Sequence, residues 1–385
     1  MKNYGRTSVN EFLGDFIVYR NLVPVDGRLP PLGDVAAKVD VEAGRIPRKS
    51  EPAYARVIAR LLGEARRLGG SRAEIRRLVY VGDTRLNDGT AFANVCSAGD
   101  WPGLAFIAAE AEGPVQLEFV PASTGQAREA TLCLANRWAA LPDFDRYCRQ
   151  RDFALDESTA VVVDLDKTAL GARGRNDRVI DQARVEAVRR TVGGLLGADF
   201  DQEGFQRAYD LLNQPEYHAF TADNQDYLAY ICLILGSGLY SLEPLVRRAR
   251  SGEVSGFRLF IEEVDERQAD LSLDLQAIHQ GIVERVRSGD PTPFKAFRYN
   301  EYRTTVERMG SLDEDTAVDE LLREEIVITQ EVRAMALAWR EQGALLFGLS
   351  DKPDEASIPS LELAAQGFEP IHRTTTHALG EGQRT

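Results

Sequence analysis

The chain has 385 residues but little cysteine, and the cysteines are not spaced for a metal site or a disulfide framework. Four cysteines are too few for a disulfide framework in a chain of this length, and no two of them form a CxxC motif. We therefore expect free thiols in a reducing compartment. The cysteines are Cys96, Cys133, Cys148 and Cys232.

Long apolar runs are also lacking. No segment approaches the roughly 20 apolar residues that cross a membrane, and the opening MKNYGRTSVNEFLGDF has no apolar signal-peptide core. The sequence therefore predicts no membrane partner and a cytoplasmic location. The formal net charge of −14 makes a nucleic-acid partner unfavourable, because phosphate backbones require a positive surface.

Histidine and lysine are scarce as well. The four histidines show no metal-ligand spacing, and nearly every basic residue is arginine, so each lysine is a rare event. Three of the lysines fall inside the motifs described below: Lys49, Lys167 and Lys352.

Strand-like and helix-like segments alternate at both ends of the chain and enclose a long helical middle. The run VVVDLD at 161–166 is continuous and β-branched, as in central strands of parallel sheets. Residues 177–340 are mostly helical by period, and residues 1–48 are expected to form an irregular arm. This order predicts a doubly wound, Rossmann-like α/β domain with a parallel sheet and a large helical insertion. The other expected elements are helices at 50–69, 130–150 and 357–367, strands at 77–82, 104–110, 115–121 and 344–350, and an extended piece at 368–380.

Two carboxylates, Asp164 and Asp166, lie at the end of the run 161–166. Side chains two residues apart in a strand point the same way, and ligands bind at this end of parallel strands. Converging carboxylates repel each other unless a cation lies between them, and hard oxygen ligands favour Mg²⁺. One aspartate can then attack phosphorus, while the other protonates the leaving oxygen and later activates water. The alternative is a strand end with two solvated acids.

A second acidic element follows the strand at 77–82. Gly82 permits a tight exit from the strand, and Asp83 would lie at the same sheet edge as the first pair. Asp88 could hold metal-bound water or orient the loop. The alternative for residues 87–89, Asn-Asp-Gly, is a surface turn, since this tripeptide is typical of turns.

A phosphate site also needs a positive charge and a hydroxyl donor. Lys49 lies directly before the helix at 50–69. The strand at 344–350 ends in Ser350, whose hydroxyl could donate to a phosphoryl oxygen. Lys352 is a second candidate cation near the phosphate, although the geometry of the turn could direct its side chain away from the site. The alternatives are an exposed lysine near a helix start and an ordinary serine turn.

These four elements resemble the motifs of the haloacid dehalogenase (HAD) superfamily. D-L-D-K-T at 164–168 resembles the first motif, hhhhDxDxT, and the strand ending in Ser350 resembles the second. R-K-S-E-P-A-Y at 48–54 resembles the third motif, and G-D-T-R-L-N-D at 82–88 resembles the fourth, GDxxxND.

The resemblance implies a Mg²⁺-dependent enzyme that forms an aspartyl-phosphate. It implies Asp164 as nucleophile, Asp166 as acid and base, and Lys49 and Ser350 as the remaining catalytic residues. The implied metal-binding residues are Asp164, Asp166, Asp83 and Asp88.

The motif order is third, fourth, first, second, which is a cyclic shift of the family's order. Termini of compact domains often lie close together, so circular permutation is tolerated. We therefore expect a permuted HAD-like core at 1–175 and 325–385 and a helical cap domain at 176–324.

The permutation makes a prediction about the sheet. The strands ending at Asp83, Asp164 and Ser350 should be parallel, with the Asp164 strand in the middle. The extended piece at 368–376 should lie in the same sheet, close to the segment of Lys49.

A cap closes over a site and supplies substrate contacts. Arg173, Arg175 and Asn176 follow the first motif directly, and Lys295 and Arg298 form a second cluster within the insertion. Both clusters are predicted to bind anionic or hydroxylated substrate groups. The alternative for each is a solvated loop or helix face.

The predicted function is Mg²⁺-dependent hydrolysis of a small phosphorylated metabolite. A phosphotransferase or phosphomutase stays open, because water and an acceptor alcohol would use the same residues. A non-catalytic binding protein of the same fold is the third possibility. The complete acidic and cationic sets argue against it, because buried like charges are unfavourable without a metal.

Overall fold

The computed structural model describes residues 1–42, 44–122 and 129–381. The chain divides into two compact units. Unit 1 comprises Met1–Gln182 and Thr305–Thr385, and unit 2 comprises Ala183–Thr304. Two helices, α6 (Asp177–Leu196) and α13 (Lys295–Val306), run across the boundaries between the units.

Unit 1 contains a seven-stranded sheet in the order β2-β9-β7-β3-β4-β6-β5. Every neighbouring pair is parallel except β5–β6, which is antiparallel. The central strands are buried along almost their whole length, as in sheets covered on both faces. The predicted α/β class with a mostly parallel sheet is therefore confirmed. The strands are β2 (Ile17–Val18), β3 (Arg77–Gly82), β4 (Gly103–Ala108), β5 (Leu117–Pro121), β6 (Ala130–Ala135), β7 (Thr159–Asp164) and β9 (Leu345–Leu349).

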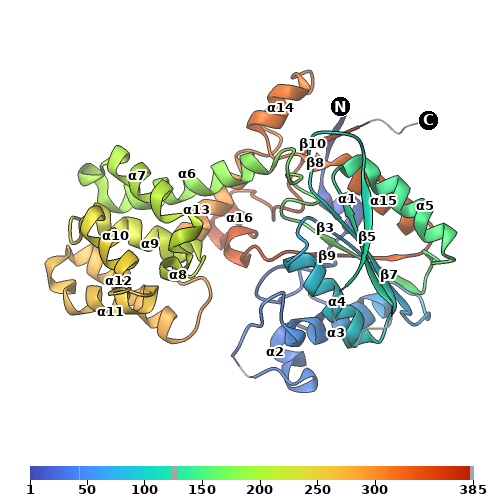
Figure 1. Ribbon diagram of the computed structural model, residues 1–385, viewed down its shortest axis with the longest axis horizontal. Helices are drawn as coiled ribbons and strands as arrows, with labels where there is room; N and C mark the ends of the chain where they lie inside the picture. Colours follow the sequence, from blue (N-terminus) through green and yellow to red (C-terminus); the bar gives the residue numbers. More distant parts are fainter. Residues whose placement is uncertain (43, 123–128, 382–385) are drawn as a thin grey trace. The chain divides into compact units, whose positions relative to one another are not determined.

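Helices cover both faces of this sheet (Figure 1). On one face, α3 (Pro52–Leu68) and α4 (Asn87–Gly99) pack together over Tyr80, Val162 and Phe347 from three strands. On the other face, α5 contacts α15, where Trp339 donates to Asp145 at 2.8 Å. These two helices are α5 (Leu141–Gln150) and α15 (Gln330–Glu341). Apart from α6 and α13, the other α-helices of unit 1 are α1 (Val9–Leu13), α2 (Leu32–Val35), α14 (Val318–Glu324) and α16 (Leu361–Ala365).

The predicted arrangement of the three motif-bearing strands is confirmed. β7 lies between β9 and β3 and is parallel to both. Asp164 is opposite Leu349 in the β7–β9 register. Asp83 directly follows β3 and Ser350 directly follows β9, so all three residues lie at the same carboxyl edge of the sheet.

The predicted helix at 130–150 is wrong in its first part. Residues Ala130–Ala135 form β6, which pairs with β4 and β5, and only Leu141–Gln150 form the helix α5. A short apolar run such as ATLCLA fits a buried strand or a buried helix equally well by period. The backbone hydrogen bonds that β6 makes with β4 and β5 favour the strand over the helix.

The expected sheet position of residues 368–376 is also wrong. The strand at this end of the chain is β10 (Thr376–Gly380), which belongs to a separate three-stranded sheet in the order β1-β10-β8. The arm at 1–48 is not wholly irregular, since its β2 occupies the edge beside β9. That edge of the sheet is therefore paired with β2 and is not open to the C-terminal piece. The other strands of the small sheet are β1 (Lys2–Thr7) and β8 (Ile328–Thr329).

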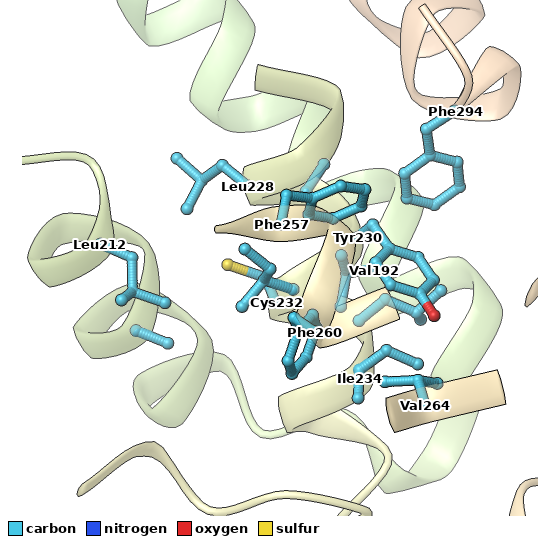
Figure 2. Packing of buried hydrophobic residues seen from close by; sticks show 14 of the residues in the cluster. Val192, Leu212, Leu228, Tyr230, Cys232, Ile234, Phe257, Phe260, Val264 and Phe294 are labelled. Carbon is cyan, nitrogen blue, oxygen red and sulfur yellow. The ribbon is translucent and has the colours of Figure 1, made fainter. Parts of the chain in front are cut away.

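Unit 2 consists of helices around a core of its own. Figure 2 shows this core, where Tyr230 meets Phe257 edge to face at a centroid distance of 5.7 Å. No helix in the described part of the chain is long and apolar enough to cross a membrane. Besides the two boundary helices, the helices are α7 (Gln202–Leu212), α8 (His218–Thr221), α9 (Gln225–Gly236), α10 (Leu242–Ser251), α11 (Phe257–Glu266) and α12 (Leu273–Arg287).

A buried ionic network ties α9 to α13 within unit 2. Asp226 is fully buried and accepts hydrogen bonds from Arg298 Nε at 2.8 Å and from the backbone N–H of Phe294 at 3.0 Å. Arg298 also donates to Glu301 at 2.6 Å. Removing one partner of such a network leaves the other charge buried and uncompensated.

Replacing Asp226 with alanine is therefore expected to destabilise unit 2 by about 3–5 kcal/mol. The three tryptophans, at 101, 138 and 339, all lie in unit 1, so amide hydrogen exchange is the suitable measurement. The exposed Glu203→Ala is the control and should change exchange little, because its ion pair with Arg207 spans 3.9 Å at the surface. Equal protection in the two variants would contradict the prediction.

Candidate functional site

Three aspartates come together at the carboxyl edge of the sheet. Asp83, Asp88 and Asp164 each place one carboxylate oxygen within 4.8 Å of the others. Their exposed fractions are 9%, 1% and 4%. Buried carboxylates this close to one another require cations, because like charges repel strongly away from water.

Lys49 supplies the first cation. Its Nζ lies 2.5 Å from Asp164 Oδ1 and 2.6 Å from Asp88 Oδ1, and all three side chains are buried. Burial alone would lower the pKa of Lys49, but Asp164 and Asp88 hold it well above its ordinary value. Burial raises the pKa of Asp164, although Lys49 acts in the opposite direction. The lysine before α3 is thus placed at the nucleophile candidate across 115 residues of sequence.

Asp88 is held by hydrogen bonds on both oxygens. Oδ1 accepts from Tyr80 at 3.1 Å as well as from Lys49, and Oδ2 accepts from the backbone of Asp83 at 3.0 Å and of Thr84 at 2.8 Å. Burial opposes its ionisation, yet Lys49 and these donors keep the pKa of Asp88 below its usual range. Asp88 therefore orients Lys49 and the turn after β3.

Gly82 makes this turn possible. A Cβ at Gly82 would lie 2.7 Å from Asp88 Cβ, which is closer than such atoms approach. The tight exit from the strand that was predicted at Gly82 has its physical reason in the close approach of Asp88. Tyr80 and the Thr84 hydroxyl, which donates to Asp88 Oδ2 at 2.8 Å, were missed by the sequence analysis. Tyr80 lies on the side of β3 that faces α4, so strand alternation was the available signal.

Arg173 supplies the second cation. Its Nε donates to Asp83 Oδ2 in a short ion pair, and its side chain keeps 37% of its surface exposed. Burial and the negative charge of Asp88 raise the pKa of Asp83 to about 7, and Arg173 acts against them. With all three carboxylates ionised, the two cations leave one net negative charge in the cluster.

Arg175 and Asn176 were predicted to contact substrate, and the structure gives them other partners. Arg175 pairs with Glu331 at 2.9 Å and with Glu110 at 3.0 Å, and only 4% of its side chain is exposed. Asn176 donates to the backbone oxygen of Glu325 at 2.9 Å and accepts from the N–H of Val327 at 3.1 Å. Arg175 ties the segment after β7 to α15 and to the segment after β4, and Asn176 ties it to the chain before α15. Substrate contact by either residue stays a prediction.

The other two core residues predicted from the motifs lie just after the ends of β9 and β7. Ser350 is 1% exposed, and its hydroxyl accepts from the Lys352 backbone at 3.1 Å. Asp166 is partly buried in the turn after β7 and is not among the three clustered aspartates. Lys352 is buried, and its backbone oxygen accepts from the N–H of Arg20 at 3.2 Å.

Lys295 and Arg298 lie in unit 2, where each has an acidic partner. Lys295 pairs with Asp290 at 2.9 Å, and Arg298 lies between Asp226 and Glu301. Arg298 is buried and serves the core of unit 2. The predicted substrate role of this pair stays a prediction.

The donor set suits a small, hard divalent cation. Mg²⁺ binds through one or two carboxylates, completed by water and substrate oxygens. Asp83 and Asp164 each have one oxygen engaged by a cation, whereas both oxygens of Asp88 are occupied by donors. The residues therefore fit Mg²⁺ with Asp83 and Asp164 as ligands and Asp88 behind them.

Comparisons of the chain with protein-family models, with curated proteins and with solved structures find no match. The resemblance to the HAD superfamily therefore rests on the motifs alone.

Proposed function

We propose that this protein is a Mg²⁺-dependent phosphohydrolase that acts on small phosphate monoesters. The observation that carries the proposal is the cluster of Asp83, Asp88 and Asp164 at one sheet edge, with Lys49 paired to the last two. Phosphoryl transfer needs a nucleophile, a positive charge on the transferring group and a site for a divalent cation. The motif resemblance to HAD enzymes is consistent with the same assignment.

The proposed chemistry has two steps. An oxygen of Asp164 attacks phosphorus while the ester oxygen leaves and takes a proton from Asp166. Water then attacks the aspartyl-phosphate and gives a proton back to Asp166, which releases phosphate and restores both carboxyl groups. Bound Mg²⁺ would neutralise charge on the phosphoryl oxygens. Lys49 holds Asp164 in place, and Ser350 is positioned at the same edge to donate to the phosphoryl group.

We further propose that unit 2 acts as a cap. The support is its place in the chain, between the strand that ends in Asp164 and the strand that directly precedes Ser350. Both strands belong to unit 1, so Ala183–Thr304 forms a helical insertion into the core unit. A helical insertion at this point can exclude water and contact the non-reacting part of a substrate.

The direct test measures phosphate release from a panel of phosphorylated sugars, amino acids and nucleosides. We expect phosphate release from at least one class of compound when Mg²⁺ is present. Excess EDTA should abolish this activity and added Mg²⁺ should restore it, because two carboxylates and the substrate would share the cation. Turnover that continues unchanged in EDTA would rule out the metal. An inactive panel with a protein that binds no Mg²⁺ would rule out the proposed function.

A further inference from the structure

The backbone of Arg173 is fixed by three hydrogen bonds. Its N–H donates to the Lys167 oxygen at 2.8 Å, and its oxygen accepts from the Glu110 N–H at 2.9 Å and from Trp138 Nε1 at 3.2 Å. Breaking all three hydrogen bonds together would be unfavourable. Arg173 therefore stays at the same place in the fold, whatever its side chain does.

The next residues anchor the segment more firmly. Gly174 has φ +75°, and a Cβ there would lie 2.1 Å from the backbone oxygen of Glu110. The loop therefore lies directly against the segment that follows β4. Arg175 is clamped between Glu110 and Glu331. These contacts fix the backbone of the loop. The side chain of Arg173 is long and partly exposed, so its guanidinium can change position while the backbone stays in place.

The guanidinium of Arg173 is bound to one of the two carboxylates that would hold a metal. Arg173 Nε donates to Asp83 Oδ2, and Asp83 is one of the two carboxylates of the cluster that fit a cation. A divalent cation at Asp83 would meet a positive charge beside it, and repulsion would favour release of the arginine. The released guanidinium presents five donors that match phosphate oxygens in pairs.

We propose that Arg173 exchanges between two partners, Asp83 without metal and the phosphoryl group of the substrate with metal. Metal binding at Asp83 drives the exchange, so the chain offers its phosphate-binding arginine only after the cation is in place. The inference rests on the proposed function, and it adds a competition between arginine and metal for one carboxylate. It makes Arg173 a substrate-binding residue whose availability is controlled by the metal.

Isothermal titration with Mg²⁺ alone tests the competition without turnover. Arg173→Gln removes the guanidinium and keeps most of the side-chain length, so we expect roughly tenfold tighter Mg²⁺ binding than in the wild-type protein. The matched control is Arg85→Gln, because Arg85 is exposed and only two residues beyond Asp83. Screening by salt should limit the effect of this exposed charge to less than about twofold.

Binding of orthophosphate to the Mg²⁺-loaded proteins tests the second partner. Arg173→Gln should weaken phosphate binding at least roughly tenfold, since a charge-assisted pair is lost, and Arg85→Gln should leave it unchanged. Circular dichroism and thermal unfolding establish that both variants are folded.

The outcomes separate the two proposals. Equal Mg²⁺ affinity in wild type and Arg173→Gln, or tighter Mg²⁺ binding with unchanged phosphate binding, overturns the exchange and leaves the proposed function standing. Tightening by Arg85→Gln as large as that by Arg173→Gln reduces the effect to general charge and also overturns the exchange. Absence of Mg²⁺ binding in every variant overturns both.

Discussion

Replacing Asp164 with asparagine is expected to lower kcat by roughly 10³-fold or more, as for removal of other nucleophiles. Asparagine has nearly the same shape, so the carboxyl edge of β7 and the pairing of Asp164 with Leu349 should persist. The loss follows because an amide oxygen is a poor nucleophile toward phosphorus and cannot form the aspartyl-phosphate. Phosphate release with Mg²⁺ and the best substrate of the panel is the measurement.

The matched control is Asp156→Asn. Asp156 precedes the same strand at its other end and is exposed there, so activity should stay near wild type. Circular dichroism and Mg²⁺ titration should show that both variants are folded. Near-normal turnover in Asp164→Asn would remove Asp164 from the nucleophile role, whatever the result at Asp156.

Replacing Lys49 with methionine is expected to have the second large effect. Methionine fills a similar volume but leaves Asp164 and Asp88 without their shared cation. Breaking a buried pair from one side destabilises by about 3–5 kcal/mol. Urea unfolding followed by tryptophan fluorescence should show this loss, because the three tryptophans report on unit 1.

Activity of Lys49→Met should fall as well, since the phosphoryl group loses a fixed positive charge. Mg²⁺ should restore part of the lost stability, because a divalent cation can neutralise the same carboxylates. Lys38→Met is the control, because Lys38 is exposed on the N-terminal arm and should change neither property. A Lys49→Met protein as stable as wild type without metal would show that the ion pairs with Asp88 and Asp164 contribute little.

Local patterns in the sequence were sufficient for the central strands and their chemistry. Short apolar runs predicted the strands that became β3, β7 and β9, because strands covered on both faces need apolar residues at nearly every position. The acids at the ends of two of them, Asp83 and Asp164, follow from the same runs. The middle position of β7 followed from the motif resemblance, and the sheet confirms it.

Only the tertiary structure decided where the remaining parts pair. Ala130–Ala135 became a strand because β4 and β5 flank it, and β2 rather than residues 368–376 took the edge beside β9. Arg175 pairs with Glu331, which lies 156 residues further along the chain, so the sequence around Arg175 could not predict that its side chain is buried.

The sequence by itself thus determined the fold class and the acids at the sheet edge, since both depend on residue type and short-range alternation along the chain. The tertiary structure decided which cation meets which acid, with Lys49 on Asp164 and Arg173 on Asp83. The physical reason is that ion pairing depends on distance in space, and contacts between residues so far apart in sequence exist only once the sheet has brought their strands together.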